Sequence, residues 1–279
     1  MTAAASALLI DMDGVLYQGE QAIPGAREVL DWLNTNRIPH QFVTNTTSRP
    51  RAALIEKLSR LEMRVDGGQI LTPPVAAARW LSAHVKGRVA LFVPHVTLTE
   101  FEQLEIADMD AALPVAAVVL GDYGERWTFE ALNRAFRWLM HESKPELIAL
   151  GMTRYWRAEE GLRLDTAPFV AALECAIGRK AVVLGKPAAP FFKAALEQVG
   201  ASAAETIMIG DDIRGDIDGA QKLGIRGLLV KTGKFTPEDL DRGIQPAAVL
   251  ESFAHLPQWW ENHVGRVHQP LISKNGQFP

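Results

Sequence analysis

Two acidic segments of the chain have residue types and spacings that could bind a metal ion. Asp11 and Asp13 stand two positions apart, directly after the apolar run 7–10. Asp211 comes one glycine after a second apolar run, 206–209. Residues two apart on an extended chain point to the same side, so we expect Asp11 and Asp13 to face one crevice.

Carboxylates gathered at one place need a cation, because they otherwise repel and raise one another's pKa. Ligands that are all oxygen, with no His or Cys beside them, indicate Mg²⁺. A calcium-binding loop fits poorly, since the twelfth position counted from Asp11 is Ala22 rather than Glu. The alternative for each acidic segment taken alone is a turn or a helix cap.

Two further polar segments follow apolar runs. Thr44 and Asn45 come directly after 41–43, and Lys186 stands between 181–184 and Pro187. Taken alone, Thr44 could be a helix cap and Lys186 a solvated side chain. Lys186 does not belong to a nucleotide-binding P-loop, because Pro187 occupies the position that Ser or Thr takes there.

The elements that position these segments alternate between strand and helix. We expect strands at 7–10, 41–43, 181–184, 206–209 and 227–230, and helices at 24–36, 48–61, 187–199 and 214–223. The middle of the chain shows the same alternation, with strands expected at 89–93, 115–120 and 147–150 and helices at 129–140 and 166–177. This alternation predicts an α/β fold with a parallel sheet, in which ligands bind at the carboxyl ends of the strands.

The composition excludes several classes of protein. The 279 residues are 48% hydrophobic, and 29 basic against 33 acidic side chains give a net charge of −4, which argues against nucleic-acid binding. A single cysteine excludes an intrachain disulfide and favours a reducing cytoplasm. No apolar run approaches the length of about 20 residues that spans a bilayer, so no membrane association is expected. The acidic residues near the start also argue against a signal peptide.

The four polar segments, taken in order, resemble the motifs of the haloacid dehalogenase-like phosphatase superfamily: Asp-x-Asp-Gly, a strand-terminal Ser or Thr, a Lys, and Gly-Asp-x-x-x-x-Asp. The resemblance covers roughly residues 8–263, and its detail is that of subfamily IIA, in which a C2-type α/β cap is inserted between the second and third motifs. It implies a Rossmann-like, doubly wound parallel core made of 1–71 and 184–279, with the cap at 72–183. The 142 positions between Thr44 and Lys186 support this independently, since a β–α–β unit needs only about 30 residues.

The resemblance also implies a function and a role for each motif residue. It implies a phosphatase that hydrolyses a small phosphorylated molecule through an aspartyl-phosphate, with Asp11 as nucleophile and Asp13 as general acid and base. Lys186 would offset negative charge, while Thr44 and Asn45 would hold the phosphoryl oxygens.

The implied cofactor is Mg²⁺, held by Asp11, the Asp13 backbone carbonyl and Asp211. Selectivity must come from the cap, where Arg154 or Trp156 is expected to contact the leaving group; a plain surface loop is the alternative. The motifs leave the substrate open among pyrophosphate, phosphoamino acids and other phosphorylated metabolites.

Two other functions stay open at this point. One is a catalytically idle Mg²⁺-binding scaffold, against which the retention of Asp13 argues. The other is phosphotransfer to an acceptor other than water. A homodimer is the expected assembly.

Overall fold

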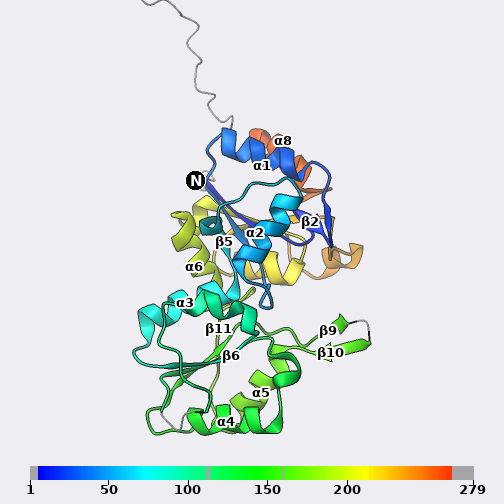
Figure 1. The fold of residues 1–279 in the computed structure, drawn as a ribbon. Coiled ribbons are helices and arrows are strands. Elements are labelled where there is room, and N and C mark those ends of the chain that lie inside the picture. The colour runs from blue at the N-terminus through cyan, green and yellow to red at the C-terminus, as the bar shows by residue number, and fades with distance from the viewer. Residues whose placement is uncertain (1–5, 111–113, 159, 266–279) are drawn as a thin grey trace, which may run out of the picture.

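The computed structural model describes residues 6–110, 114–158 and 160–265 and arranges them around two parallel sheets. The larger sheet lies in the upper half of Figure 1 and the smaller one in the lower half. The first and the last described elements, β1 (Ala7–Asp11) and α8 (Leu256–His263), belong to the upper half, so the smaller sheet is formed by the middle of the chain. The α/β class expected from the alternating pattern is confirmed.

The larger sheet has six strands in the order β14-β13-β12-β1-β4-β5, and every neighbouring pair is parallel. Side chains alternate across it: Leu8 and Ile10 pack on one face, and Leu9 packs on the other. Burial on both faces explains why its strands are continuous apolar runs. The strands are β1 (Ala7–Asp11), β4 (His40–Val43), β5 (Ile70–Leu71), β12 (Thr206–Gly210), β13 (Arg226–Val230) and β14 (Ala248–Leu250).

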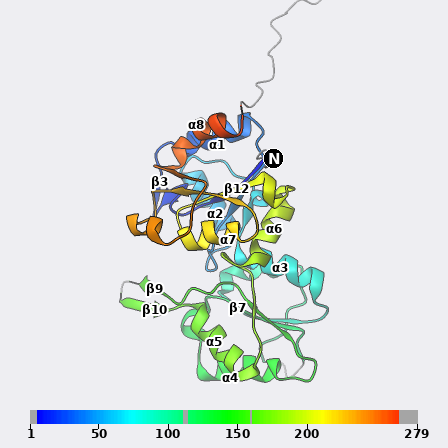
Figure 2. The same ribbon diagram turned by 180° about the vertical axis from the view of Figure 1, so that it is seen from behind.

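Helices cover both faces of this sheet, which makes it doubly wound (Figure 2). One face carries α1 (Ala26–Thr35), α2 (Arg51–Arg60) and α8 (Leu256–His263), and the other carries α6 (Ala189–Val199) and α7 (Gly219–Gln221). The expected helix 214–223 is instead a π-helical turn, Ile213–Asp218, followed by α7. The expected helix 24–36 begins two residues late, because Gly25 has φ 82° and cannot start the helix itself.

The smaller sheet has four parallel strands in the order β11-β8-β7-β6. Helices α4 and α5 pack on one face of it, while the other face turns toward α3. The elements are α3 (Pro73–His84), β6 (Val89–Phe92), β7 (Ala117–Leu120), α4 (Phe129–Leu139), β8 (Glu146–Ala149), α5 (Thr166–Ile177) and β11 (Val182–Val183).

Two antiparallel hairpins and several short helical turns complete the fold. One hairpin, β2 (Tyr17–Gln18) and β3 (Gln21–Ala22), follows β1, and the other, β9 (Tyr155–Ala158) and β10 (Gly161–Leu164), extends from the smaller sheet. The 3₁₀ turns are Gly67–Gln69, His95–Phe101, Gly124–Arg126, Ala203–Glu205, Pro237–Asp241 and Phe253–His255. Across the described ranges, no helix has the length and apolar character to cross a membrane.

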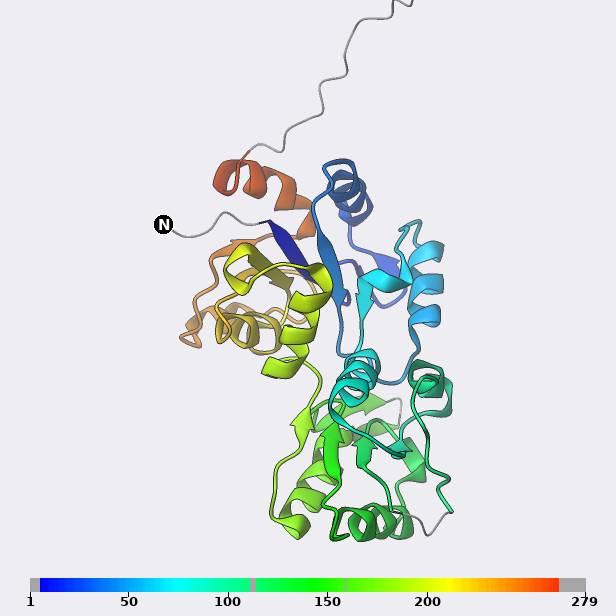
Figure 3. The same cartoon turned by 90° about the vertical axis from the view of Figure 1, so that its left-hand side faces the viewer.

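A single hydrophobic cluster joins the two halves, with α3 lying between them (Figure 3). It contains Leu9 of the larger sheet and Val119 of the smaller one. An ion pair reinforces the junction: Glu100 is buried and accepts from the backbone N–H of Arg51 at 2.7 Å and from its Nε at 2.9 Å. The two halves are therefore tied together by packing and by charge.

Candidate active site

The predicted site residues of the larger sheet lie where neighbouring parallel strands end. Asp11 is the last residue of β1, Thr44 follows β4, and Asp211 follows β12. The register fixes this arrangement, because Asp11 pairs with Val43 while Ile10 pairs with Ile209. The strand pairing thus brings together residues that are up to 200 positions apart in the sequence.

Lys186 is the charged centre of the site. Its Nζ lies 2.6 Å from Asp11 Oδ1 and 2.7 Å from Asp216 Oδ1, and it also donates to the Val43 carbonyl at 3.3 Å. Asn45 positions this lysine: its side chain accepts from Lys186 N at 2.8 Å and donates to Lys186 O at 2.9 Å. Asn45 therefore holds the backbone that presents the ammonium group to two carboxylates.

Three buried carboxylates surround this ammonium group. Oxygens of Asp11, Asp211 and Asp216 all lie within 4.8 Å of one another. Burial raises the pKa of Asp211 to about 6 and that of Asp216 to about 7, and Asp11 adds to both increases. Burial alone would lower the pKa of Lys186, but Asp11 and Asp216 outweigh it and raise that pKa. The same three carboxylates also raise the pKa of Lys234, whose backbone contacts Asp211. Because two ammonium groups face three carboxylates, the cluster has a place for a further positive charge.

One carboxylate oxygen of Asp211 is available to bind a cation. Its Oδ2 accepts from the backbone N–H of Lys234 at 2.7 Å, while its Oδ1 is buried and has no hydrogen-bond partner in the described part of the chain. A Cβ at Gly14 or Gly233 would run into this carboxylate, and both glycines have positive φ, 84° and 67°. The glycines therefore leave the space that the carboxylate occupies, and an all-oxygen set of this kind suits a hard divalent metal ion.

Asp13 lies apart from this cluster. It is exposed and lines a cavity of about 590 Å³, together with Asn45 and Trp156. The side chain of Thr44 is buried and exchanges a hydrogen bond with the hydroxyl of Thr46 at 3.0 Å. Thr46 itself lines the cavity, so Thr44 stands directly behind its wall.

The two cap residues singled out in the sequence have different positions. Trp156 on β9 is 42% exposed and lines the cavity from the smaller sheet's side. Arg154 precedes β9, is exposed, and does not line this cavity; its guanidinium lies 5.8 Å from the ring of Tyr155. The cavity therefore lies between the two halves of the molecule and brings Trp156, but not Arg154, to the same space as Asp13.

Some contacts and residues of the site could not be predicted from the sequence. Asp216 ends the Gly-Asp-x-x-x-x-Asp motif, but its ion pair with Lys186 depends on the π-helical turn that follows β12. The contact of Lys234 with Asp211 depends on the path of the chain after β13. Asp122 also lines the cavity, from the loop after β7. It belongs to none of the recognised motifs, so only the fold reveals it.

Comparisons with known proteins agree with this arrangement. A haloacid dehalogenase-like hydrolase family model matches residues 8–107, and a HAD-hydrolase-like model matches residues 183–256. The chain is 41% identical over 254 residues to haloacid dehalogenase-like hydrolase domain-containing protein 2 of Bos taurus, covering 90% of this chain and 94% of that protein.

Two further matches are to proteins named as phosphatases. The phospholysine phosphohistidine inorganic pyrophosphate phosphatase of Homo sapiens is 39% identical over 236 residues, which cover 83% of this chain and 85% of that protein. The motifs of the sequence also predict a likeness to this phosphatase, and the identity confirms it. The p-nitrophenyl phosphatase from Archaeoglobus fulgidus has a TM-score of 0.82 at 27% identity, covering 92% of this chain and 100% of that chain.

Proposed function

The chain belongs to the haloacid dehalogenase-like hydrolases and is a phosphatase of that family, and from this premise we propose that it hydrolyses small phosphorylated molecules through a covalent intermediate on Asp11. The observation that carries the proposal is the position of Lys186, held at 2.6 Å from Asp11 and at 2.7 Å from Asp216. A carboxylate held in this way needs no deprotonation before it attacks, and the ammonium offsets the charge that accumulates around it.

The reaction has two steps, and Asp13 acts in both. In the first, an Asp11 carboxylate oxygen bonds to phosphorus, the bond from phosphorus to the leaving oxygen breaks, and Asp13 gives its proton to that oxygen. In the second, Asp13 takes a proton from water, whose oxygen bonds to phosphorus and releases Asp11 and inorganic phosphate. The position of Asp13 on the cavity wall, exposed and outside the buried cluster, suits contact with the leaving group and with water.

We assign the metal site to Asp11, Asp211 and the backbone carbonyl of Asp13, with Mg²⁺ as the ion. The fit rests on the unpartnered Oδ1 of Asp211 and on the space that Gly14 and Gly233 leave around that carboxylate. When bound, Mg²⁺ supplies positive charge to the phosphoryl oxygens and to the clustered carboxylates.

The remaining predicted residues bind the substrate in this proposal. Thr44 and the backbone N–H of Asn45 hold phosphoryl oxygens, which leaves the Asn45 side chain on Lys186. Residues 72–183 form the cap, and residues 1–71 and 184–279 form the core. Trp156 contacts the leaving group from the cap. The role predicted for Arg154 requires its side chain to turn away from Tyr155.

The names of two similar proteins indicate the size of the substrate. One relative's name includes phospholysine, phosphohistidine and inorganic pyrophosphate, and another protein with this fold is named for p-nitrophenyl phosphate. We propose a phosphorylated metabolite of similar size for this chain. A homodimer and a cytoplasmic location stay predictions.

The test is phosphate release from a panel of phosphorylated metabolites and 4-nitrophenyl phosphate, with Mg²⁺ and with EDTA. The Asp11→Asn variant serves as the blank, because it keeps the shape of the side chain and removes the nucleophile. Mg²⁺-dependent release that disappears in the variant supports the proposal. Release that survives in Asp11→Asn refutes the assigned nucleophile, and a folded protein that releases nothing favours an idle binding protein.

A further inference from the structure

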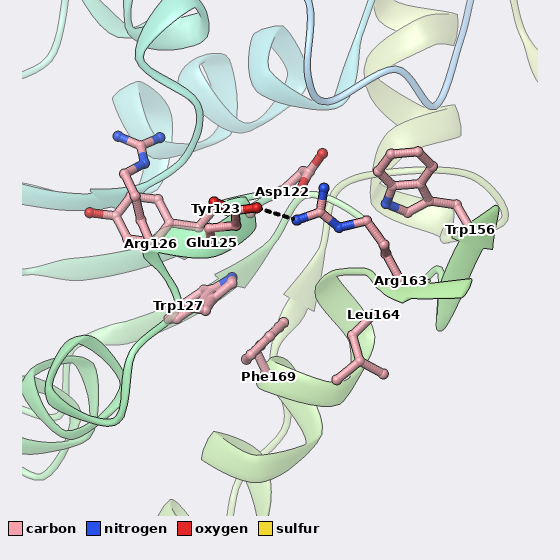
Figure 4. A pocket seen from close by; sticks show the side chains of 10 residues that line it. Asp122, Tyr123, Glu125, Arg126, Trp127, Trp156, Arg163, Leu164 and Phe169 are labelled. Carbon is pink, nitrogen blue, oxygen red and sulfur yellow. Dashed lines mark hydrogen bonds and ion pairs between the residues drawn. The ribbon is translucent and has the colours of Figure 1, made fainter. Parts of the chain in front are cut away.

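A second cavity, of about 510 Å³, adjoins the candidate active site on the side of the smaller sheet (Figure 4). The loop after β7, the hairpin β9–β10 and the start of α5 form its walls. Asp122 and Trp156 line both cavities, so these two residues mark the junction between them. A leaving group that extends from the phosphoryl position toward the cap meets this junction first.

Aromatic rings form much of the wall of the second cavity. Trp127 is stacked on Phe169 at 4.7 Å and on Phe92 at 5.2 Å between ring centroids, so its position is fixed by packing. Figure 4 shows Trp127, Phe169 and Trp156 around the pocket. Aromatic faces carry negative electrostatic potential and attract cations that approach within about 6 Å.

The carboxylates at the junction add to this attraction. Asp122 and Asp165 form no ion pair with any described residue. Burial and the neighbouring Asp165 raise the pKa of Asp122, and the charge of Arg163 offsets only part of this increase. Asp165 also caps α5 by accepting from the backbone N–H of Thr166 at 2.6 Å, so it has a structural role as well.

The two arginines of the second cavity's wall have partners of their own. Arg163 faces the same pocket, but its ion pairs are with Glu125 at 3.0 Å and Glu160 at 3.2 Å. Arg126 donates to the Val93 carbonyl at 2.6 Å. The wall of the first cavity carries four acidic side chains and two basic ones, and one of those two is paired with an acidic group of the same wall. With Glu125, Arg126 and Arg163 of the second cavity included, the two walls carry five acidic and four basic side chains, so the junction keeps a net negative charge.

We infer that Asp122, Asp165 and Trp156 select substrates whose leaving group carries a positively charged nitrogen. This inference rests on the proposed phosphatase function and specifies its substrate class. The substrate is a phosphate monoester of an amino alcohol. An Asp11 oxygen bonds to phosphorus, the bond from phosphorus to the ester oxygen breaks, and the alcohol takes a proton from Asp13 and leaves with its ammonium charge unchanged. Water then releases phosphate from Asp11. A neutral leaving group of the same shape is not attracted by these carboxylates, so it should bind at the junction less tightly than the cationic one.

Two substrates of equal shape isolate the charge: phosphocholine, and 3,3-dimethylbutyl phosphate, in which carbon replaces the quaternary nitrogen. We expect kcat/KM of the parent protein to favour phosphocholine by about tenfold, the ratio that a cation held by a carboxylate and an aromatic face supports. Asp122→Asn should lower this ratio several-fold, because it removes the carboxylate that lines both cavities while Asp165 and Trp156 remain. The control is Glu142→Gln, an exposed charge change in the same half of the chain, which should keep the ratio of the parent.

The outcomes separate this inference from the proposed function. A parent protein that hydrolyses 4-nitrophenyl phosphate but does not discriminate between the two esters, or that leaves both intact, overturns the inference alone. A preference that stays at the parent's value in Asp122→Asn also overturns it. A parent that hydrolyses none of the three compounds refutes the proposed function. In that case the binding of both esters to Asp11→Asn, measured by calorimetry, tests the junction without turnover, and equal affinities overturn the inference.

Discussion

The glycine pair around Asp211 leads to a prediction whose size can be worked from the structure: Gly233→Ala should destabilise the protein and impair the metal site together. Gly233 has φ 67°, and a Cβ there would collide with the Asp211 carboxylate and lie 2.6 Å from the Cα of Gly14. The left-handed conformation costs a residue with a side chain about 1–2 kcal/mol. Overpacking at a tightly filled position costs about 1–3 kcal/mol more. The free energy of unfolding should therefore fall by about 2–5 kcal/mol.

Gly224→Ala is the matched control. Gly224 has φ 82°, but nothing lies within 4 Å of the position where its Cβ would be. Its loss should be the conformational cost alone, about 1–2 kcal/mol. Urea unfolding of the three proteins gives both values, and the difference between the variants is the cost of the collision at Asp211.

Activity supplies the second readout. The added methyl group must displace the Asp211 carboxylate or the backbone of Gly14, and a shift of about 1 Å at a catalytic site can cost on the order of 10²-fold in rate. Phosphate release at saturating Mg²⁺ should fall in Gly233→Ala and stay near the parent value in Gly224→Ala. If both variants lose equal stability and keep equal activity, the glycines do not make room for Asp211 and the assigned metal site is wrong.

Three further predictions concern the charges of the site and of the junction between the two halves. Lys186→Met leaves buried carboxylates without their counter-charge and should lower the free energy of unfolding of the metal-free protein by about 3–5 kcal/mol, measured by urea unfolding in EDTA; an unchanged value would contradict the charge balance described. Because burial raises the pKa of Asp211 to about 6 and a protonated carboxyl does not bind a metal ion, Mg²⁺ affinity should fall about tenfold per pH unit below that value; calorimetric titrations between pH 5 and 8 check this, and a flat profile would count against Asp211 as a ligand. Glu100→Gln removes the charge that Arg51 binds and should cost about 1–3 kcal/mol in the same urea assay, whereas no loss would mean that packing alone joins the halves.

The sequence predicted the residues at the strand ends more successfully than it predicted the outlines of the elements. Asp11, Thr44 and Asp211 follow buried apolar runs. Parallel pairing places such positions at one edge of a sheet, independently of the conformation of the connecting loops. Helix ends depend on local backbone geometry, and the late start of α1 after Gly25 is an example. A Cβ at Gly25 would also lie 2.6 Å from that of Ala254, a long-range contact that a local pattern does not contain.

Residues that act across long distances in the sequence were the least predictable. The pairing of Asp216 with Lys186 requires a π-helical turn, which has no sequence signature as clear as that of an α-helix. Asp122 reaches the cavity only because the smaller sheet brings the loop after β7 beside the larger one. Trp156 could be singled out because a donor-rich aromatic segment directly follows a predicted strand, a pattern typical of binding loops.

The hydrophobic cluster shared by the two sheets also determines how the protein should unfold. Leu9 and Val119 belong to the same continuous apolar interior, with Phe191 and Phe192 of α6 between the halves. Neither half can unfold without exposing apolar surface of the other, so heating should give one cooperative transition rather than two separate ones. The same coupling limits modularity: the smaller sheet and its helices could not be transplanted into another core without also redesigning the face of α6 against which they pack.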